Sequence, residues 1–181
     1  MAHIGRRTFL FMLAAAPLAA RVFAASPAAP DFVFPSIDGG ELRLAEFRGG
    51  PVLVVNTASK CMNTPQYDGL QSLWERYRER GLTVVGMPSP SFGQELESAE
   101  AVKEFCEMNF AIDFPMTGLV EVKGPAAHPF YVWAAEQGYA PQWNFYKFLL
   151  DGEGRIVAQF ETQTKPDDPK LIAAIEALLP R

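Results

Sequence analysis

Residues 51–89, PVLVVNTASKCMNTPQYDGLQSLWERYRERGLTVVGMPS, decide the fold of this 181-residue chain. The run 51–59 is apolar and rich in β-branched residues over the length of a strand, which is typical of a strand buried on both faces. Thr64, followed by a proline, predicts a helix N-terminus, and apolar side chains recur at helical spacing up to Gly81. Because a second buried strand is expected over 82–89, the stretch predicts two parallel strands joined by a right-handed helical crossover.

The segments on either side complete one α/β domain. A hairpin is expected over 31–47, because short apolar runs flank a glycine turn at Gly39 and Gly40. No domain boundary or internal repeat is evident, so the whole of 31–181 is interpreted as a thioredoxin-like domain, with a central mixed β-sheet flanked by helices and an N-terminal β-hairpin. The remaining expected elements are a helix beginning at Ser98, a helix over 128–136, two strands over 147–160 and a closing helix over 167–179.

The first 24 residues have the pattern of an export signal. They begin with a basic segment, continue with an apolar run of small residues and end in V-F-A. Arg6 and Arg7, followed by T-F-L, resemble the twin-arginine signals of bacteria. The apolar run is about 13 residues long, short of the roughly 20 that a membrane span needs. We therefore expect a twin-arginine signal peptide over 1–24, a flexible lead over 25–30, and a periplasmic protein without stable membrane insertion after cleavage.

Composition and charge exclude several classes of function. The chain is 49% hydrophobic and 20% charged, which is typical of one ordinary soluble domain rather than a fibre or a membrane bundle. Its formal net charge is −5, and no basic cluster interleaved with aromatics follows the signal, so nucleic acid is not an expected partner. Cys61 and Cys106 lack C-x-x-C spacing, and with His128 alone beyond residue 24 they make a poor zinc site. No metal or cofactor is expected.

Cys61 is the candidate reactive residue. It follows a buried strand and precedes a predicted helix start by about one turn, where unpaired backbone N–H groups and the positive end of the helix dipole favour a thiolate. The thiolate is the nucleophilic form of cysteine. A cysteine in such a place is also commonly a small buried hydrophobe, so its position alone leaves its reactivity open.

Longer motifs around this cysteine resemble a known family. Residues 55–70, VNTASKCMNTPQYDGL, are similar to the VNVASKCGxTPQYxxL signature of glutathione peroxidases, with Cys61 at the position of the peroxide-attacking cysteine or selenocysteine. Met62 stands where that signature has glycine. The resemblance continues in GMPSPSFGQE (86–95), FCEMNFAIDFPM (105–116), AAHPFY (126–131) and WNFYKFLLDGEGRIV (143–157).

The resemblance implies an activity and a set of site residues. A family member is expected to be a thiol peroxidase that reduces hydrogen peroxide and organic hydroperoxides in the response to oxidative stress. By the same resemblance, Gln94, Trp143 and Asn144 place hydrogen-bond donors around the Cys61 sulfur. Such donors stabilise a thiolate and can hold the departing oxygen as the O–O bond breaks.

Cys106 is expected to complete the catalytic cycle. Oxidised Cys61 would be a sulfenic acid, which condenses with a nearby thiol to give a disulfide. Cys106 resembles the resolving position of bacterial family members that use thioredoxin-type donors, and both a thioredoxin-type reductant and glutathione stay open. Because a disulfide needs two Cα atoms within about 7 Å, the helix that carries Cys106 is expected to unwind.

Alternatives remain open for both cysteines. The chain could be a noncatalytic periplasmic thioredoxin-like module in which Cys61 and Cys106 form a structural disulfide. Cys106 could instead be a buried core residue of its helix. His128 begins a predicted helix, and we interpret it as a capping or packing residue rather than a catalytic base.

Overall fold

The computed structural model describes residues 27–180. The expected signal peptide over 1–24 lies outside these residues. Of the expected lead over 25–30, the described part includes Ala29, which is buried, donates its N–H to the Gly154 carbonyl at 2.9 Å and accepts a hydrogen bond from Arg48 at 2.6 Å. Packing against the domain therefore begins slightly before residue 31. None of the described helices combines the length and apolarity that a membrane crossing requires.

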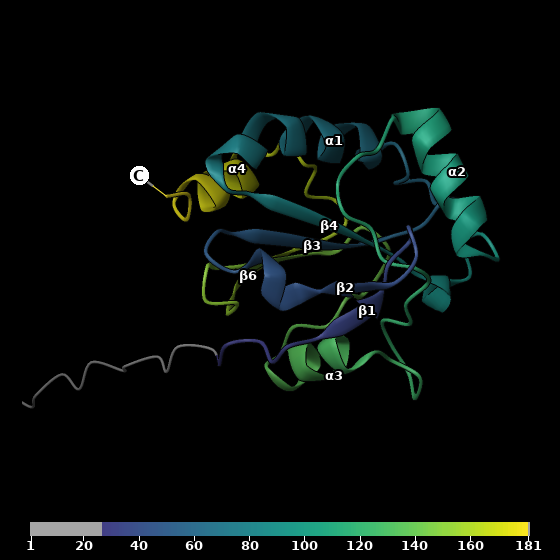
Figure 1. Ribbon diagram of the computed structural model, residues 1–181, viewed down its shortest axis with the longest axis horizontal. Helices are drawn as coiled ribbons and strands as arrows, with labels where there is room; N and C mark the ends of the chain where they lie inside the picture. Colours follow the sequence, from purple (N-terminus) through teal and green to yellow (C-terminus); the bar gives the residue numbers. More distant parts are fainter. Residues whose placement is uncertain (1–26, 181) are drawn as a thin grey trace, which may run out of the picture.

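A four-stranded mixed sheet in the order β4-β3-β5-β6 lies at the centre of the domain (Figure 1). Every residue of β3 is buried, as its unbroken apolar run predicts. β3 pairs in parallel with β4 and antiparallel with β5, which in turn pairs antiparallel with β6. The expected mixed sheet is therefore confirmed. The strands are β3 (Val52–Thr57), β4 (Thr83–Pro88), β5 (Lys147–Leu150) and β6 (Ile156–Phe160).

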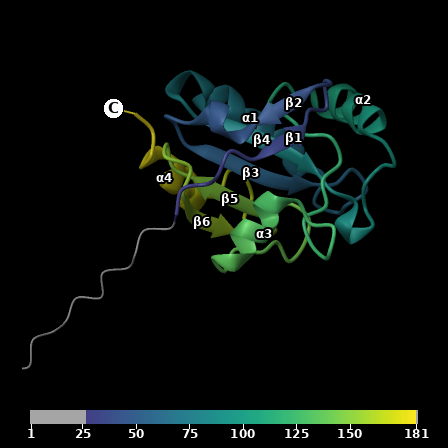
Figure 2. The ribbon, with the colours of Figure 1, turned by 60° about the horizontal axis from the view of Figure 1, so that its bottom comes forward.

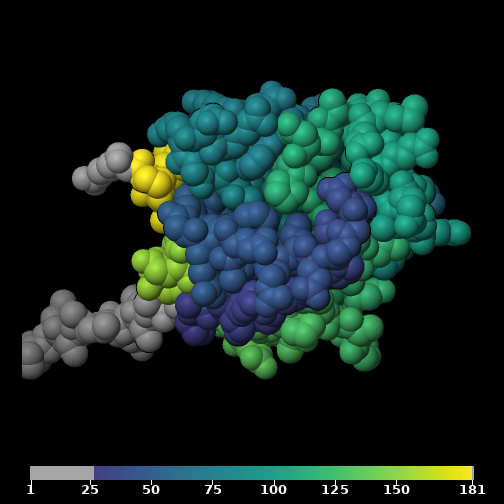
Figure 3. Space-filling model, in the orientation of Figure 1, coloured from purple at the N-terminus to yellow at the C-terminus, as the bar shows by residue number. Residues whose placement is uncertain are grey.

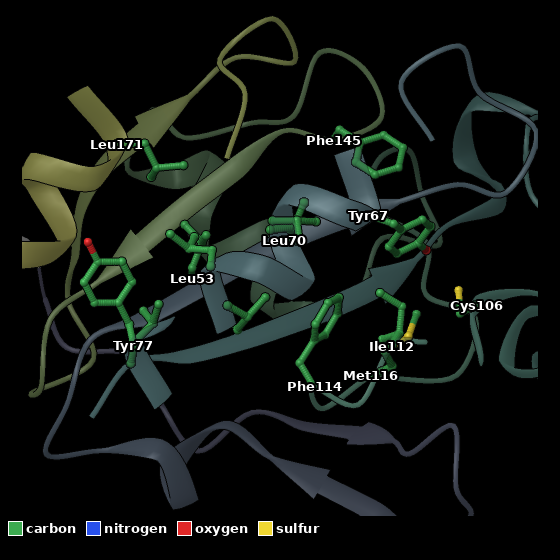
Figure 4. Packing of buried hydrophobic residues seen from close by; sticks show 14 of the residues in the cluster. Leu53, Tyr67, Leu70, Tyr77, Cys106, Ile112, Phe114, Met116, Phe145 and Leu171 are labelled. Carbon is green, nitrogen blue, oxygen red and sulfur yellow. The ribbon is translucent and has the colours of Figure 1, made fainter. Parts of the chain in front are cut away.

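One face of the sheet is covered by three of the helices. These are α1 (Gln66–Tyr77), α2 (Ala99–Phe110) and α4 (Pro169–Glu176). Their apolar side chains share one core with Leu53 and Val55 of β3. Figure 4 shows part of this core, with Leu70 and Tyr77 of α1 next to Leu53. Figure 1 shows α1 and α4 above the sheet and α2 at one end of it.

The opposite face of the sheet packs against the N-terminal hairpin and α3 (Pro129–Glu136). The hairpin consists of β1 (Val33–Pro35) and β2 (Glu41–Arg43), paired antiparallel as expected. Figure 2 shows this hairpin and α3 beside the sheet, and Figure 3 shows the hairpin as a continuous part of the surface. Val52 and Val54 of β3 point into this second core. Because successive side chains of β3 point to opposite faces, this strand contributes to the cores on both sides of the sheet.

The start of α2 agrees with the sequence, and the start of α1 differs from it. Ser98 caps α2 as expected, because its side chain accepts a hydrogen bond from the Ala101 N–H. The expected N-cap at Thr64 is wrong, since α1 follows Pro65 without any side-chain cap. The short 3-10 segments are η1 (Leu44–Phe47), η2 (Arg78–Arg80) and η3 (Pro90–Phe92).

Candidate active site

Thr64 fastens the loop that carries Cys61. The Cys61 N–H donates to the Thr64 hydroxyl oxygen at 3.1 Å, and that hydroxyl lies 2.8 Å from the Ala58 carbonyl and 2.7 Å from the Cys61 carbonyl. The hydroxyl has one proton, so it donates to one of the two carbonyls at a time. The side chain that the sequence placed at the helix cap thus holds Cys61 between the end of β3 and the start of α1.

The Cys61 sulfur receives two hydrogen bonds from one residue. The backbone N–H of Asn63 lies 3.4 Å from Sγ, and the Asn63 Nδ2 lies 3.7 Å from it. Cys61 is 7% exposed. Hydrogen-bond donors and the nearby N-terminus of α1 both stabilise negative charge on sulfur. The loop geometry therefore suits a thiolate nucleophile.

A chain of polar side chains lies behind Asn63. The Oδ1 atom of Asn63 lies 3.4 Å from the Gln66 Nε2, which also donates to the Thr162 carbonyl at 2.7 Å. The Gln66 Oε1 accepts from the Lys147 Nζ at 2.8 Å. The Thr162 carbonyl can only accept a hydrogen bond, so it must face the NH₂ end of the Gln66 amide, which places the oxygen end toward Lys147 and the NH₂ end toward Asn63. The Asn63 Nδ2 is consequently left to face the sulfur.

Lys147 is fully buried in β5, which is unusual for a lysine. Its Nζ also donates to the Phe145 carbonyl at 2.8 Å. Burial lowers the pKa of Lys147 from an ordinary 10.5 to about 7, because the charged form loses its hydration. Gln66 and Lys147 lie inside the TPQY and KF parts of the family motifs, but those motifs alone do not show that the two side chains meet.

Two of the three other expected site residues are brought together beside the Cys61 loop. The Asn144 Nδ2 donates to the Gln94 Oε1 at 3.0 Å. The backbone carbonyl of Gln94 accepts from the N–H of Lys60, next to Cys61, at 2.9 Å. Asn144 is fully buried, and its own carbonyl accepts from the Thr162 hydroxyl at 2.8 Å. Thr162 therefore contacts both Asn144 and Gln66, which joins the two polar groups of the site.

Trp143, the third expected residue, has a partly open position. The residue is 42% exposed, its ring centroid lies 5.1 Å from that of Phe92, and its carbonyl accepts from the Asn56 side chain. Phe145, two residues later, has a φ of 62°, a left-handed conformation that is rare for a bulky residue. Its N–H donates to the Asn56 carbonyl at 2.6 Å. Asn56 therefore holds the W-N-F segment on both sides of Asn144.

The direct donors of the sulfur differ from those that the family resemblance implies. Within residues 27–180, no hydrogen bond joins the Cys61 Sγ to Gln94, Trp143 or Asn144, and Asn63 supplies the donors. The expected role of these three residues as donors around the sulfur stays a prediction. Asn63 was not identified from the sequence, because it occupies a position that the family signature leaves unspecified.

Glu95 ties the Gln94 loop to the Cys61 loop. Its Oε1 accepts from the Ser59 N–H at 3.0 Å and from the Leu96 N–H at 2.8 Å. Burial raises the pKa of the Glu95 carboxyl, and the hydrogen bonds from Ser59 and Leu96 oppose that rise. The hydrogen bonds of the Glu95 carboxylate therefore hold the neighbouring Gln94 at a fixed position relative to Ser59 and Cys61, although Gln94 lies in a loop. The sequence did not single out Glu95.

Cys106 lies inside the core that also contains Cys61. It is 1% exposed on α2, and both thiols are free in this structure. Figure 4 shows the Tyr67 hydroxyl directed toward Cys106. Burial raises the pKa of the Cys106 thiol to about 11, although the Tyr67 hydroxyl partly offsets that effect. At neutral pH the buried Cys106 is therefore protonated and a poor nucleophile.

His128 lies outside this site and has the capping and packing role expected for it. Its Nδ1 accepts from the Phe130 N–H at 3.2 Å, and its Nε2 lies 3.0 Å from the Val33 carbonyl. Its ring stacks on Phe34 with 4.1 Å between centroids. Within the described chain, no group of three or more His, Cys, Asp or Glu side chains is arranged to hold a metal ion.

Comparisons with known proteins agree with this geometry. The family model for glutathione peroxidase matches residues 30–135. The hydroperoxy fatty acid reductase gpx1 of Synechocystis sp. is 42% identical over 156 residues, covering 80% of this chain and 91% of that protein. The glutathione peroxidase of Lactococcus lactis is 35% identical over 144 residues, covering 76% and 92%.

Solved structures show the same relationship. The crystal structure of Trgpx in its apo form superposes with a TM-score of 0.62 at 32% identity, covering 83% of this chain and 97% of that one. A thiol:disulfide interchange protein DsbE from Chlorobium tepidum superposes with a TM-score of 0.64 at 20% identity, covering 87% and 99%. The second likeness shows the thioredoxin-like fold alone.

Proposed function

Because the chain belongs to the glutathione peroxidase family and is a thiol peroxidase, we propose that Cys61 attacks the O–O bond of hydrogen peroxide and organic hydroperoxides. The observation that carries this proposal is the placement of the Cys61 sulfur, which accepts two hydrogen bonds from Asn63 beside the N-terminus of α1. Membership of a peroxidase family argues against a noncatalytic module, and the free thiols of Cys61 and Cys106 give no support to a structural disulfide.

In the first step, the Cys61 thiolate attacks one peroxide oxygen and the O–O bond breaks. The sulfur is oxidised to a sulfenic acid, and the departing alkoxide or hydroxide takes up a proton to leave as alcohol or water. Asn63 stabilises the thiolate before attack. Gln94, Trp143 and Asn144 are proposed to hold the departing oxygen, since their amide and indole N–H groups donate without titrating.

In the second step, the Cys106 thiol condenses with the sulfenic acid. A disulfide forms, water leaves, and a thioredoxin-type dithiol or two molecules of glutathione then reduce the disulfide. Cys106 is 1% exposed on α2, so it has to leave this buried place to be reduced by an external thiol, and its pKa of about 11 leaves little thiolate while it stays there. We therefore propose that α2 unwinds locally during each turnover.

The names of two relatives support one class of organic substrate. Two proteins of Synechocystis sp. named hydroperoxy fatty acid reductases are 42% and 43% identical to this chain. We include hydroperoxides of long-chain fatty acids among the organic substrates.

Stopped-flow oxidation of the reduced protein tests the first step, with Cys61→Ser as the control. Consumption of hydrogen peroxide on the order of 10⁴ M⁻¹s⁻¹ or faster, lost in Cys61→Ser, supports the peroxidase. A rate equal to that of free cysteine refutes it.

Cys106→Ser tests the second step with a thioredoxin-type reductant. The rate of multiple turnover should fall in this variant, while the first oxidation of Cys61 stays fast. Unchanged turnover would remove the resolving role.

We further propose that the twin-arginine motif directs the protein to the periplasm. The support is the N-terminal sequence pattern, in which Arg6 and Arg7 precede a short apolar run. Expression of the full chain and of an Arg6→Lys, Arg7→Lys variant, followed by cell fractionation, tests export. The native chain should be recovered from the periplasm and the variant from the cytoplasm, whereas equal distribution of the two contradicts the proposal.

A further inference from the structure

A groove of about 730 Å³ begins beside the catalytic loop. Met62 and Asn63 line the end that lies next to Cys61, and the groove then follows α1. Its volume lies within the range of sites that hold small organic molecules. Because Asn63 also donates to the Cys61 sulfur, the groove and the reactive atom share a wall residue.

The walls of the groove are largely apolar. Leu73 of α1 and Ile172 of α4 line it, together with Pro166 of the segment between β6 and α4. Gly69 allows this segment to approach α1, since a Cβ at position 69 would lie only 3.1 Å from Pro166 side-chain atoms. Met62 is 96% exposed and forms an adaptable apolar rim. An apolar chain would find contacts along this surface.

Charge varies along the groove. Asp68, Asp167 and Lys165 all line it. Arg76 lines the far end, and its closest carboxylate, from Glu176, lies 4.0 Å away. The Arg76 side chain is 62% exposed and keeps donors available. Arg76 is therefore a cation that can bind a carboxylate at the far end of the groove.

The length of the groove fits an amphipathic chain. Gln66 and Arg76 are ten helical positions apart, which is roughly 15 Å at the rise of an α-helix. We propose that this groove binds the acyl chain of a free long-chain fatty acid hydroperoxide, with its peroxide at the Met62 end and its carboxylate at Arg76. This inference rests on the proposed peroxidase function and adds a substrate subsite to it.

Met62 gives the sharpest test, because Met62→Gly introduces the residue of the family signature and leaves the Asn63 donors in place. Single-turnover oxidation of reduced protein is measured with hydrogen peroxide, an 18-carbon fatty acid hydroperoxide and the methyl ester of that compound. Loss of one buried methylene corresponds to about fourfold in rate. We expect Met62→Gly to lower the ratio of the rate with the fatty acid hydroperoxide to the rate with hydrogen peroxide about fourfold or more.

Matched variants locate the effect along the groove. Ile172→Asp should act as Met62→Gly does, whereas Val132→Asp, at a half-exposed apolar residue on α3 and across the sheet, should change nothing. The native protein should react up to about fivefold faster with the free acid than with the methyl ester, and Arg76→Gln should abolish this preference. Circular dichroism and the rate with hydrogen peroxide show that each variant is folded.

The outcomes separate the groove from the peroxidase. Slow oxidation of the native protein by every hydroperoxide overturns the proposed function itself. Fast oxidation by hydrogen peroxide, with the same ratio of long-chain to hydrogen peroxide rates in native protein, Met62→Gly and Ile172→Asp, overturns the groove alone. Equal rates with acid and ester in the native protein overturn the placement of the carboxylate at Arg76.

Discussion

Replacing Lys147 by methionine should change how the stability of the protein depends on pH. Lys147 is fully buried, and among residues 27–180 its Nζ has hydrogen bonds only to neutral oxygens, those of the Gln66 side chain and the Phe145 carbonyl. Methionine has a similar length and no charge. Lys147→Met therefore removes a titrating group from the core while it largely preserves packing.

The expected magnitude follows from the pKa of Lys147. Burial lowers that pKa to about 7 in the folded protein, whereas an unfolded chain keeps an ordinary value of 10.5. The unfolded chain binds more protons between these two values, so the free energy of unfolding rises with pH there and levels off below about 7. With a limiting slope of about 1.4 kcal/mol per pH unit, the native protein should gain roughly 2 to 3 kcal/mol relative to Lys147→Met between pH 6 and pH 9.

Urea unfolding of the fully reduced proteins at pH 6, 7, 8 and 9 measures this gain. The difference between native protein and Lys147→Met cancels the titration of groups that the two share. Lys170→Met, at an exposed lysine on α4, is the matched control and should show no such trend. A native-minus-variant difference that stays constant within about 0.5 kcal/mol over this range refutes the assignment of Lys147 as a group that loses its proton near neutrality.

Three further predictions concern single side chains. Asn63→Ala should slow peroxide oxidation of Cys61 about two- to tenfold in stopped-flow measurements, because one donor to sulfur is lost, and an unchanged rate would show that this donor is idle. Ser98→Ala should lower the free energy of unfolding by about 1 kcal/mol in urea, since the α2 N-cap disappears, and a stability equal to that of native protein contradicts the capping role. At pH 8, Cys106 should react with iodoacetamide at least ~100-fold more slowly than in the urea-unfolded chain, as peptide mapping can determine, whereas similar rates would mean that the thiol is not buried.

The fold could be predicted because its signals are local. The unbroken apolar run of β3, the glycine turn of the hairpin and the Ser98 cap each depend on residues near one another in sequence. Thr64 shows the limit of such signals. A threonine before a proline fits a helix cap, but its hydroxyl instead binds the carbonyls of Ala58 and Cys61, because that loop has polar backbone groups to satisfy.

The site was predictable only in part. Cys61 stands at a place that local rules identify, and the family motifs bring in Gln94 and Asn144, which the structure joins by a hydrogen bond. The chain from Asn63 through Gln66 to Lys147 joins residues 81 positions apart at its longest link. Nothing in the spacing of residues along the sequence shows that two such side chains meet, so this part of the site needed the three-dimensional structure.

The burial of Cys106 sets a limit on how the enzyme responds to dose. If Cys106 resolves the sulfenic acid, each turnover waits for α2 to open, whereas a second peroxide molecule arrives at a rate that rises with its concentration. At low peroxide concentration, disulfide formation would be faster than overoxidation. At high peroxide concentration, the sulfenic acid would be oxidised to sulfinic acid, which inactivates the enzyme irreversibly. The opening rate of α2 would then set the rate of resolution. The peroxide concentration at which the enzyme becomes inactivated would therefore measure how often that helix opens.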